Sequence, residues 1–209
     1  MKNLLAVLFF FTAVLSAQTS NTNEPSNAFK TTLVNLLQKD KLVTDEFNLA
    51  INSWVGDFYA EINSKSSRAK NLRKLNYKVK PKLEDLYIKK KMMVDEFRKV
   101  FEDEMSISNV ITPEMAKSSL KRLTTFFDDW FKNQNKTFSY MDQMVKIFDD
   151  CDFTYNSNAT NPDQIFLFST NNCRDQFNKL MVQMNQQISL EEAQKVKFVT
   201  NFSSIFSGN

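Results

Sequence analysis

Apolar residues recur at three- and four-residue steps along most of this chain, the spacing that places side chains on one face of an α-helix. The segment 28–38 predicts a first short helix, with an apolar face of Phe29, Leu33, Leu36 and Leu37. Thr44 then reads as an N-cap, because Asp45 and Glu46 follow it where the helix dipole favours acids. The second helix that it predicts has the apolar face Phe47, Ala50, Ile51, Trp54, Phe58 and Ile62.

Two prolines mark boundaries in the middle of the chain. Pro81 lacks a backbone donor and crowds the turn before it, so it predicts an end or a kink in the helical stretch 72–79. A new amphipathic helix should follow, up to about Glu104. The Thr-Pro-Glu sequence at 112–114 has a capping hydroxyl, proline at the first helical position and a carboxylate in the first turn. It predicts a long helix that continues to Asp150.

The C-terminal part is less regular. The Asn- and Ser-rich segment 154–163 predicts a loop, and 165–168 predicts either a turn of helix or an extended segment. A further helix should follow, and Ser189 with Glu192 has the capping-box pattern that would start a last one. With two glycines and four prolines in 209 residues, repeated tight hairpins are disfavoured. The predicted fold is all-α, a single-domain antiparallel bundle of five to six helices over 27–206.

The first 17 residues have the pattern of a secretory signal peptide. Lys2 precedes an apolar run over 4–15, and small residues follow it. That run is too short to cross a bilayer, which takes about 20 residues. The polar segment 18–26, which contains Pro25, predicts a flexible lead. The alternative is that this segment forms a buried N-terminal helix. A signal peptide predicts that the protein is extracellular or lies in the lumen of the secretory pathway, with no transmembrane segment after the signal peptide is removed.

Two cysteines, Cys151 and Cys173, lie in the part that would be exported. In an oxidising compartment they most simply form a disulfide with each other, while two buried thiols are the alternative. Their number and spacing exclude a CxxC redox pair and a four-thiolate metal site.

The absence of histidine removes many kinds of catalysis from consideration. No histidine-based nucleophile system or general base is possible, and most zinc and haem sites lose their usual ligand. Two glycines cannot build a phosphate-binding loop. Neighbouring acids on a helix diverge by about 100°, so we interpret the acidic clusters as solvated faces or helix ends. These acidic clusters are Glu102-Asp103-Glu104, Asp128-Asp129, and Asp149-Asp150 with Asp152. The sequence therefore predicts no enzyme, no cofactor and no metal site.

Charge is nearly balanced overall but uneven along the chain. The sequence has 27 basic and 24 acidic residues, so loss of Lys2 with the signal peptide leaves a net charge of +2. We do not expect a nucleic-acid partner. Residues 65–82 nevertheless carry eight cations and no acid, a pattern compatible with binding to anionic lipid or sulfated glycan, and equally with an ordinary exposed helix. They are Lys65, Arg68, Lys70, Arg73, Lys74, Lys78, Lys80 and Lys82.

Three Asn-x-Ser/Thr patterns are candidate glycosylation acceptors, at Asn135, Asn158 and Asn201. Asn158 falls in the predicted loop. Asn135 and Asn201 fall in predicted helices, so each would need to face outward.

The chain is rich in phenylalanine and methionine, side chains that either fill a solid core or line a pocket for an apolar ligand. The leading hypothesis is a secreted, non-enzymatic binding protein, with an apolar small molecule or a protein as partner. An enclosed apolar cavity of about 300 Å³ or more would favour the carrier, and an exposed apolar patch would favour a protein partner. The alternatives are an anionic lipid or glycan binder acting through residues 65–82, and a structural component of a secreted granule or matrix.

One short segment resembles a known family. Residues 28–62 are similar to the opening helices of the SXP/RAL-2 secreted proteins of nematodes, through Lys39-Asp40-Lys41-Leu42, Thr44, Glu46 and Trp54-Val55. The resemblance covers under a fifth of the chain, and we transfer no residue role from it.

Overall fold

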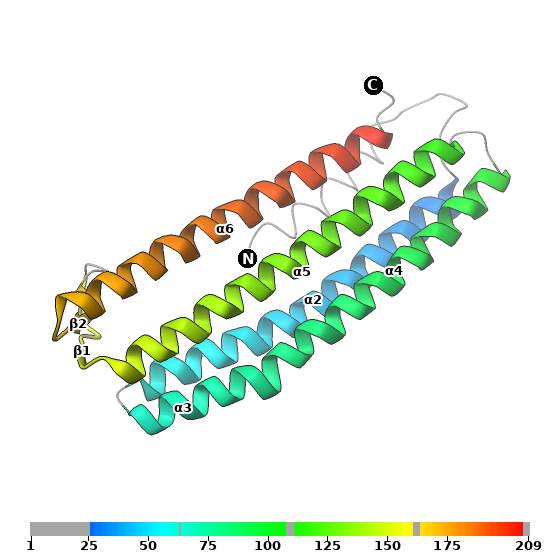
Figure 1. Ribbon diagram of the computed structural model, residues 1–209. Coiled ribbons are helices and arrows are strands. Elements are labelled where there is room, and N and C mark those ends of the chain that lie inside the picture. The colour runs from blue at the N-terminus through cyan, green and yellow to red at the C-terminus, as the bar shows by residue number, and fades with distance from the viewer. Residues whose placement is uncertain (1–25, 63, 108–110, 161–163, 207–209) are drawn as a thin grey trace. The chain divides into compact units, whose positions relative to one another are not determined.

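A computed structural model describes residues 26–62, 64–107, 111–160 and 164–206 (Figure 1). The predicted signal peptide and all of the predicted lead except Ser26 lie outside these residues. The described helices are α2 (Asn27–Glu61), α3 (Lys65–Lys74), the π-helical turn η1 (Leu75–Val79), α4 (Lys80–Ile107), α5 (Pro113–Asp150) and α6 (Asn171–Phe206). The mostly helical fold is confirmed.

The predicted number of helices, five to six, is wrong, because predicted boundaries lie inside continuous helices. Within the described residues the chain forms four continuous helical stretches. Thr44 is not an N-cap: its hydroxyl donates to the carbonyl of Asp40 (2.8 Å) in the middle of α2. Ser189 likewise donates to the carbonyl of Asn185 (3.0 Å) within α6. Both hydroxyls bond one turn back, the arrangement that lets serine and threonine sit inside a helix.

Pro81 neither ends nor breaks its helix, because α3, η1 and α4 follow one another without a gap. The backbone N–H of Lys80 donates to the carbonyl of Leu75, five residues back, which makes the turn wider than an α-helical one. Buried residues here recur at steps of four, and each such step turns an α-helix by about 40°. The wide turn absorbs this drift, so the buried side chains stay on one face: Asn71, Leu75, Val79 and Leu83.

The segment after α5 contains a short two-stranded antiparallel sheet. Strand β1 (Phe153–Tyr155) pairs with β2 (Phe166–Phe168), with Phe153 opposite Phe168. The predicted loop at 154–163 is therefore wrong at its start, and 165–168 takes the extended alternative. Alternating apolar residues in β1 and β2 direct the phenylalanines to one face of the sheet.

The chain divides into two compact units, each containing part of every long helix. Within the described residues, unit 1 comprises 26–46, 85–107, 111–130 and 192–206. Its core is built from the apolar faces of α2, α4 and α5 and from Ile111, which lies between α4 and α5. The Phe198 ring of α6 stacks on Phe126 with ring centroids 4.1 Å apart. The buried members of this core are Phe29, Leu33, Leu36, Met93, Val94, Phe97, Val100, Phe101, Ile111, Ala116, Leu123 and Phe127.

Unit 2 comprises Phe47–Glu84 and Phe131–Glu191. One end of it is an aromatic cluster around Phe148, the last fully buried ring of α5. Rings from the hairpin and from α2 and α6 lie with their centroids 4.8 to 5.9 Å from that of Phe148. They belong to Phe58, Phe153, Phe166, Phe168 and Phe177.

Candidate binding sites

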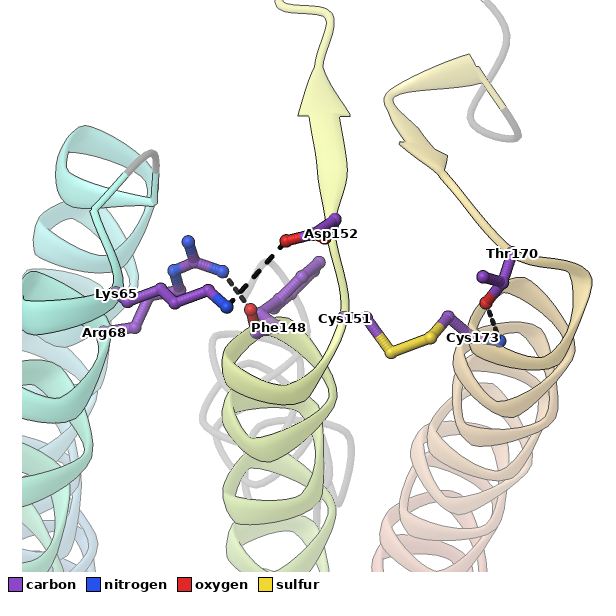
Figure 2. The surroundings of a disulfide bond; sticks show 7 residues. All are labelled: Lys65, Arg68, Phe148, Cys151, Asp152, Thr170 and Cys173. Atoms are coloured by element: carbon purple, nitrogen blue, oxygen red, sulfur yellow. Dashed lines mark hydrogen bonds and ion pairs between the residues drawn. A yellow bond between two sulfur atoms is a disulfide. The ribbon is translucent and has the colours of Figure 1, made fainter.

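The disulfide predicted between Cys151 and Cys173 is present, with an S–S distance of 2.07 Å (Figure 2). Cys151 directly follows α5, and Cys173 lies in the first turn of α6. The hydroxyl of Thr170 accepts from the backbone N–H of Cys173 (3.3 Å) and so caps α6. The bond therefore joins the end of one helix to the start of the next and encloses the hairpin.

Arg68 and Lys65, two of the eight basic residues singled out in the sequence, help to hold this end of unit 2 (Figure 2). Arg68 is only 5% exposed, and its guanidinium donates to the carbonyl of Phe148 in the last turn of α5. It also lies over the Phe153 ring, 4.8 Å from the centroid. Burial lowers the pKa of Arg68, and Asp149 and Asp152 oppose that shift. A cation at a helix C-terminus is stabilising, so the role of Arg68 is structural. Lys65 makes a looser pair with Asp152 at 3.8 Å.

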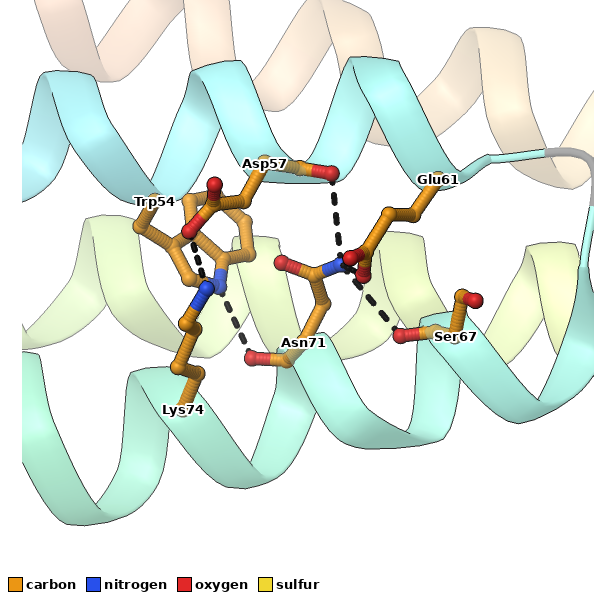
Figure 3. A network of polar contacts seen from close by, with 6 residues as sticks. All are labelled: Trp54, Asp57, Glu61, Ser67, Asn71 and Lys74. Carbon is orange, nitrogen blue, oxygen red and sulfur yellow. Dashed lines mark hydrogen bonds and ion pairs between the residues drawn. The ribbon is translucent and has the colours of Figure 1, made fainter.

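Lys74 and Lys80 also form ion pairs within unit 2. Lys74 pairs with Asp57 of α2, beside a network that joins α2 to α3 (Figure 3). In that network the indole of Trp54 donates to the carbonyl of Asn71 (2.9 Å), whose side-chain amide donates to Glu61 (3.0 Å). Lys80 pairs with Asp142 of α5 at 2.5 Å. Four of the eight predicted polyanion-binding cations therefore have internal partners.

The other four cations, Lys70, Arg73, Lys78 and Lys82, are exposed and form no ion pair with the described residues. Among them lies Tyr77, whose side chain is 78% exposed. Sequence reasoning missed Tyr77. Its position out of phase with the apolar residues Leu75 and Val79 was the available signal.

A groove lies between α4 and α5 in unit 1, with a volume of about 440 Å³. It is open to solvent, not enclosed. Apolar side chains line it together with three cations and one carboxylate. The cations are Arg98, Lys117 and Lys121, and the carboxylate is Glu102. The apolar and small lining residues are Val94, Phe101, Met105, Pro113, Ala116, Leu120 and Thr124.

The acidic clusters are less solvated than predicted. Glu104 is only 1% exposed, because it accepts from the backbone N–H and the hydroxyl of Ser26 at the start of α2. Asp128 accepts from the Tyr87 hydroxyl (2.6 Å) and pairs with Lys91 (2.6 Å). These two contacts, Lys91 first, lower the pKa of Asp128. Among the described residues, no three acidic or cysteine side chains are grouped so that they would hold a metal ion.

Two of the three candidate glycosylation sites are on the surface. Asn135 is exposed on α5, although its side-chain amide donates to the carbonyl of Phe131 (3.1 Å). Asn158 is exposed in the turn that follows β1. The side chain of Asn201 lies outside the described residues.

No family model, curated protein or solved structure matches this chain. The resemblance of residues 28–62 to the nematode family therefore gains no support. None of the described helices contains a stretch long and apolar enough to cross a membrane.

Proposed function

We propose that this chain is an exported, non-enzymatic binding protein whose α4–α5 groove takes a small amphipathic anion, such as a single-chain carboxylate. The observation that carries the proposal is the groove itself, which combines an apolar floor with a cationic rim. The disulfide and the lack of a membrane-spanning stretch among the described helices are compatible with an extracellular or secretory-lumen location.

The groove has the size and lining of a small-molecule site. Its volume of about 440 Å³ falls in the range of roughly 300 to 1,000 Å³ that ligand pockets occupy. The floor includes Met105, a flexible side chain that adapts to the shape of an apolar ligand. Because the groove is open, one end of a ligand would stay in water, which suits an amphipathic molecule better than a wholly apolar one.

The charges at the rim favour a negative head group. Lys117 and Lys121 are exposed, one turn apart on α5, and form no ion pair with the described residues. Arg98 faces the groove from α4 while pairing with Asp95 at 2.8 Å. Glu102 is the single carboxylate in the lining, so the formal charge of the lining residues themselves is +2. The walls are two long helices, so little ordering would accompany binding.

Native mass spectrometry of the secreted protein, followed by denaturing extraction, tests whether such a molecule is carried. We expect an added mass that extracts as an anionic amphiphile. The site is tested by titration with dodecanoate that carries a fluorophore at its far end. We expect Lys117→Glu with Lys121→Glu to weaken this binding at least tenfold, through removal of two cations and addition of two anions.

The matched control is Lys132→Glu with Lys136→Glu, which makes the same change of charge at the same spacing elsewhere on α5. It should change the affinity less than twofold. Equal loss in both variants, or none in either, would contradict the groove as the site. Failure of the wild-type protein to bind the probe would overturn the proposed function.

A further inference from the structure

The wide turn η1 builds a second surface, in unit 2, that does not involve the groove. We call Lys70, Arg73, Tyr77, Lys78 and Lys82 the basic face; all five side chains are exposed. Lys70 and Lys82 are twelve residues apart, so a regular α-helix would turn one away from the other by about 120°. Lys70, Lys78 and Lys82 each directly precede a buried residue, namely Asn71, Val79 and Leu83. Because η1 keeps those buried residues in line, it also keeps the three lysines in one row.

The charges in and beside this row favour an anionic partner. Lys74 lies in the same row, directly before buried Leu75, and pairs with Asp57, while Lys80 pairs with Asp142. No acidic residue occurs between Lys65 and Lys82. Lys70, Lys78 and Lys82 lie in that row and Arg73 lies beside it. The four cations therefore form a stripe of positive charge, unpaired by any described residue and about 18 Å long at 1.5 Å of helix per residue.

The shape of the stripe disfavours a membrane as its partner. A helix that binds at a membrane surface inserts its apolar side between the lipids. Here that side is covered by unit 2, since Leu75, Val79 and Leu83 are 0%, 4% and 1% exposed. Tyr77 is the one large apolar side chain of the basic face, too little for insertion but well placed to pack against a flat ring.

We propose that the basic face binds a sulfated polysaccharide. Its cations would pair with successive sulfate groups along the linear chain. The Tyr77 ring would lie against the apolar face of a sugar ring. Nucleic acid has a similar linear charge, so the choice of a glycan rests on the export proposed above, because an exported protein meets extracellular glycans.

The experiment uses the full disulfide-bonded protein and a fluorescently labelled heparin oligosaccharide. We expect the combined replacement of Lys70, Arg73, Lys78 and Lys82 by glutamine to weaken binding at least tenfold. The control replaces four exposed lysines elsewhere by glutamine, and it should weaken binding less than threefold. These control residues are Lys99, Lys132, Lys146 and Lys179. Thermal unfolding measured by circular dichroism establishes that both variants are folded.

Three further measurements define the partner. Tyr77→Ala should weaken heparin binding about threefold to tenfold with no change of charge, whereas Tyr77→Trp should retain it. Equal losses in the two four-residue variants, or unchanged binding of desulfated heparin, would overturn the proposal. Tighter binding to phosphatidylserine vesicles or to single-stranded DNA than to heparin would overturn the choice of a glycan. Because the groove residues are untouched, the dodecanoate titration stays an independent test of the proposed function.

Discussion

The ammonium of Lys90 on α4 is bound by the carboxylate of Asp40 on α2, inside unit 1. The Lys90 side chain is only 7% exposed. It also donates to the Thr44 hydroxyl (3.1 Å) and lies 5.0 Å from the ring centroid of Phe127 and 5.2 Å from that of Trp130. This buried pair sets the register of α2 against α4, because a shift of either helix would leave a charge without its partner.

Removal of one member of the Asp40–Lys90 pair should destabilise the protein, whereas replacement of both by apolar residues should not. We expect Asp40→Ala to lower the free energy of unfolding by about 3 kcal/mol, since it leaves a buried cation unpaired. Asp40→Leu combined with Lys90→Met should restore stability to within about 1 kcal/mol of the wild-type value, because two apolar side chains need no partner. Urea denaturation measures both. A double variant less stable than Asp40→Ala would contradict this account.

Gly56, in the C-terminal third of α2, should lower the stability of the protein without a structural benefit. A Cβ atom built at this position meets no other atom within 4 Å. Gly56→Ala should therefore raise the free energy of unfolding by roughly 0.5 to 1 kcal/mol, through helix propensity and a less flexible unfolded chain. Thermal unfolding checks this, with Ala60→Gly at another exposed position of α2 as the reverse control. A loss of stability in Gly56→Ala would show that the glycine is needed there.

Loss of the disulfide should destabilise the protein substantially. Cys151 and Cys173 are 22 positions apart, and the chain-entropy model gives about 3 to 3.5 kcal/mol for a loop of this size. We expect replacement of both cysteines by alanine to lower the free energy of unfolding by that amount in urea. Adding a reductant should lower wild-type stability but leave the double variant unchanged. A loss below about 1 kcal/mol would mean that the aromatic cluster alone holds the hairpin.

Asp149 should make stability depend on pH. Burial raises its pKa above the usual 3.8, Arg68 opposes the shift, and Asp150 adds to it. Its buried Oδ1 finds no hydrogen-bond partner among the described residues. A raised pKa in the folded state means that the native protein binds the proton more tightly than the unfolded chain does. The contribution of Asp149 to the free energy of unfolding therefore falls as pH rises from about 3.8 through the raised pKa.

We therefore expect Asp149→Asn to be more stable than the wild-type protein at neutral pH. The advantage should shrink as the pH is lowered through that window and vanish below it. Unfolding in urea between pH 3 and pH 7 measures the difference, and the exposed Asp103→Asn is the control. An advantage for Asp149→Asn that does not change with pH would contradict the assignment.

Local sequence pattern is sufficient to determine several features of this protein. The three- and four-residue apolar spacing predicts helices correctly along most of the described chain. The Thr112 cap before Pro113 is confirmed, since its hydroxyl accepts from the backbone N–H of Met115 (3.2 Å) at the start of α5. The pairing of Cys151 with Cys173 was the simplest expectation for two cysteines in an oxidising compartment, and it is confirmed. Each of these features depends on residues that are near in sequence or have a single possible partner.

Tertiary structure decided where helices continue and which charges remain exposed. Thr44 and Ser189 have the residue types of helix starts, but each lies inside a continuous helix, where its hydroxyl bonds one turn back. Arg68 and Lys78 belong to the same run of cations in the sequence. Arg68 is buried against the last turn of α5, whereas Lys78 is exposed. The groove between α4 and α5 likewise depends on which faces meet. Sequence periodicity specifies the apolar side of a helix, but partners distant in sequence determine what that side and the polar side contact.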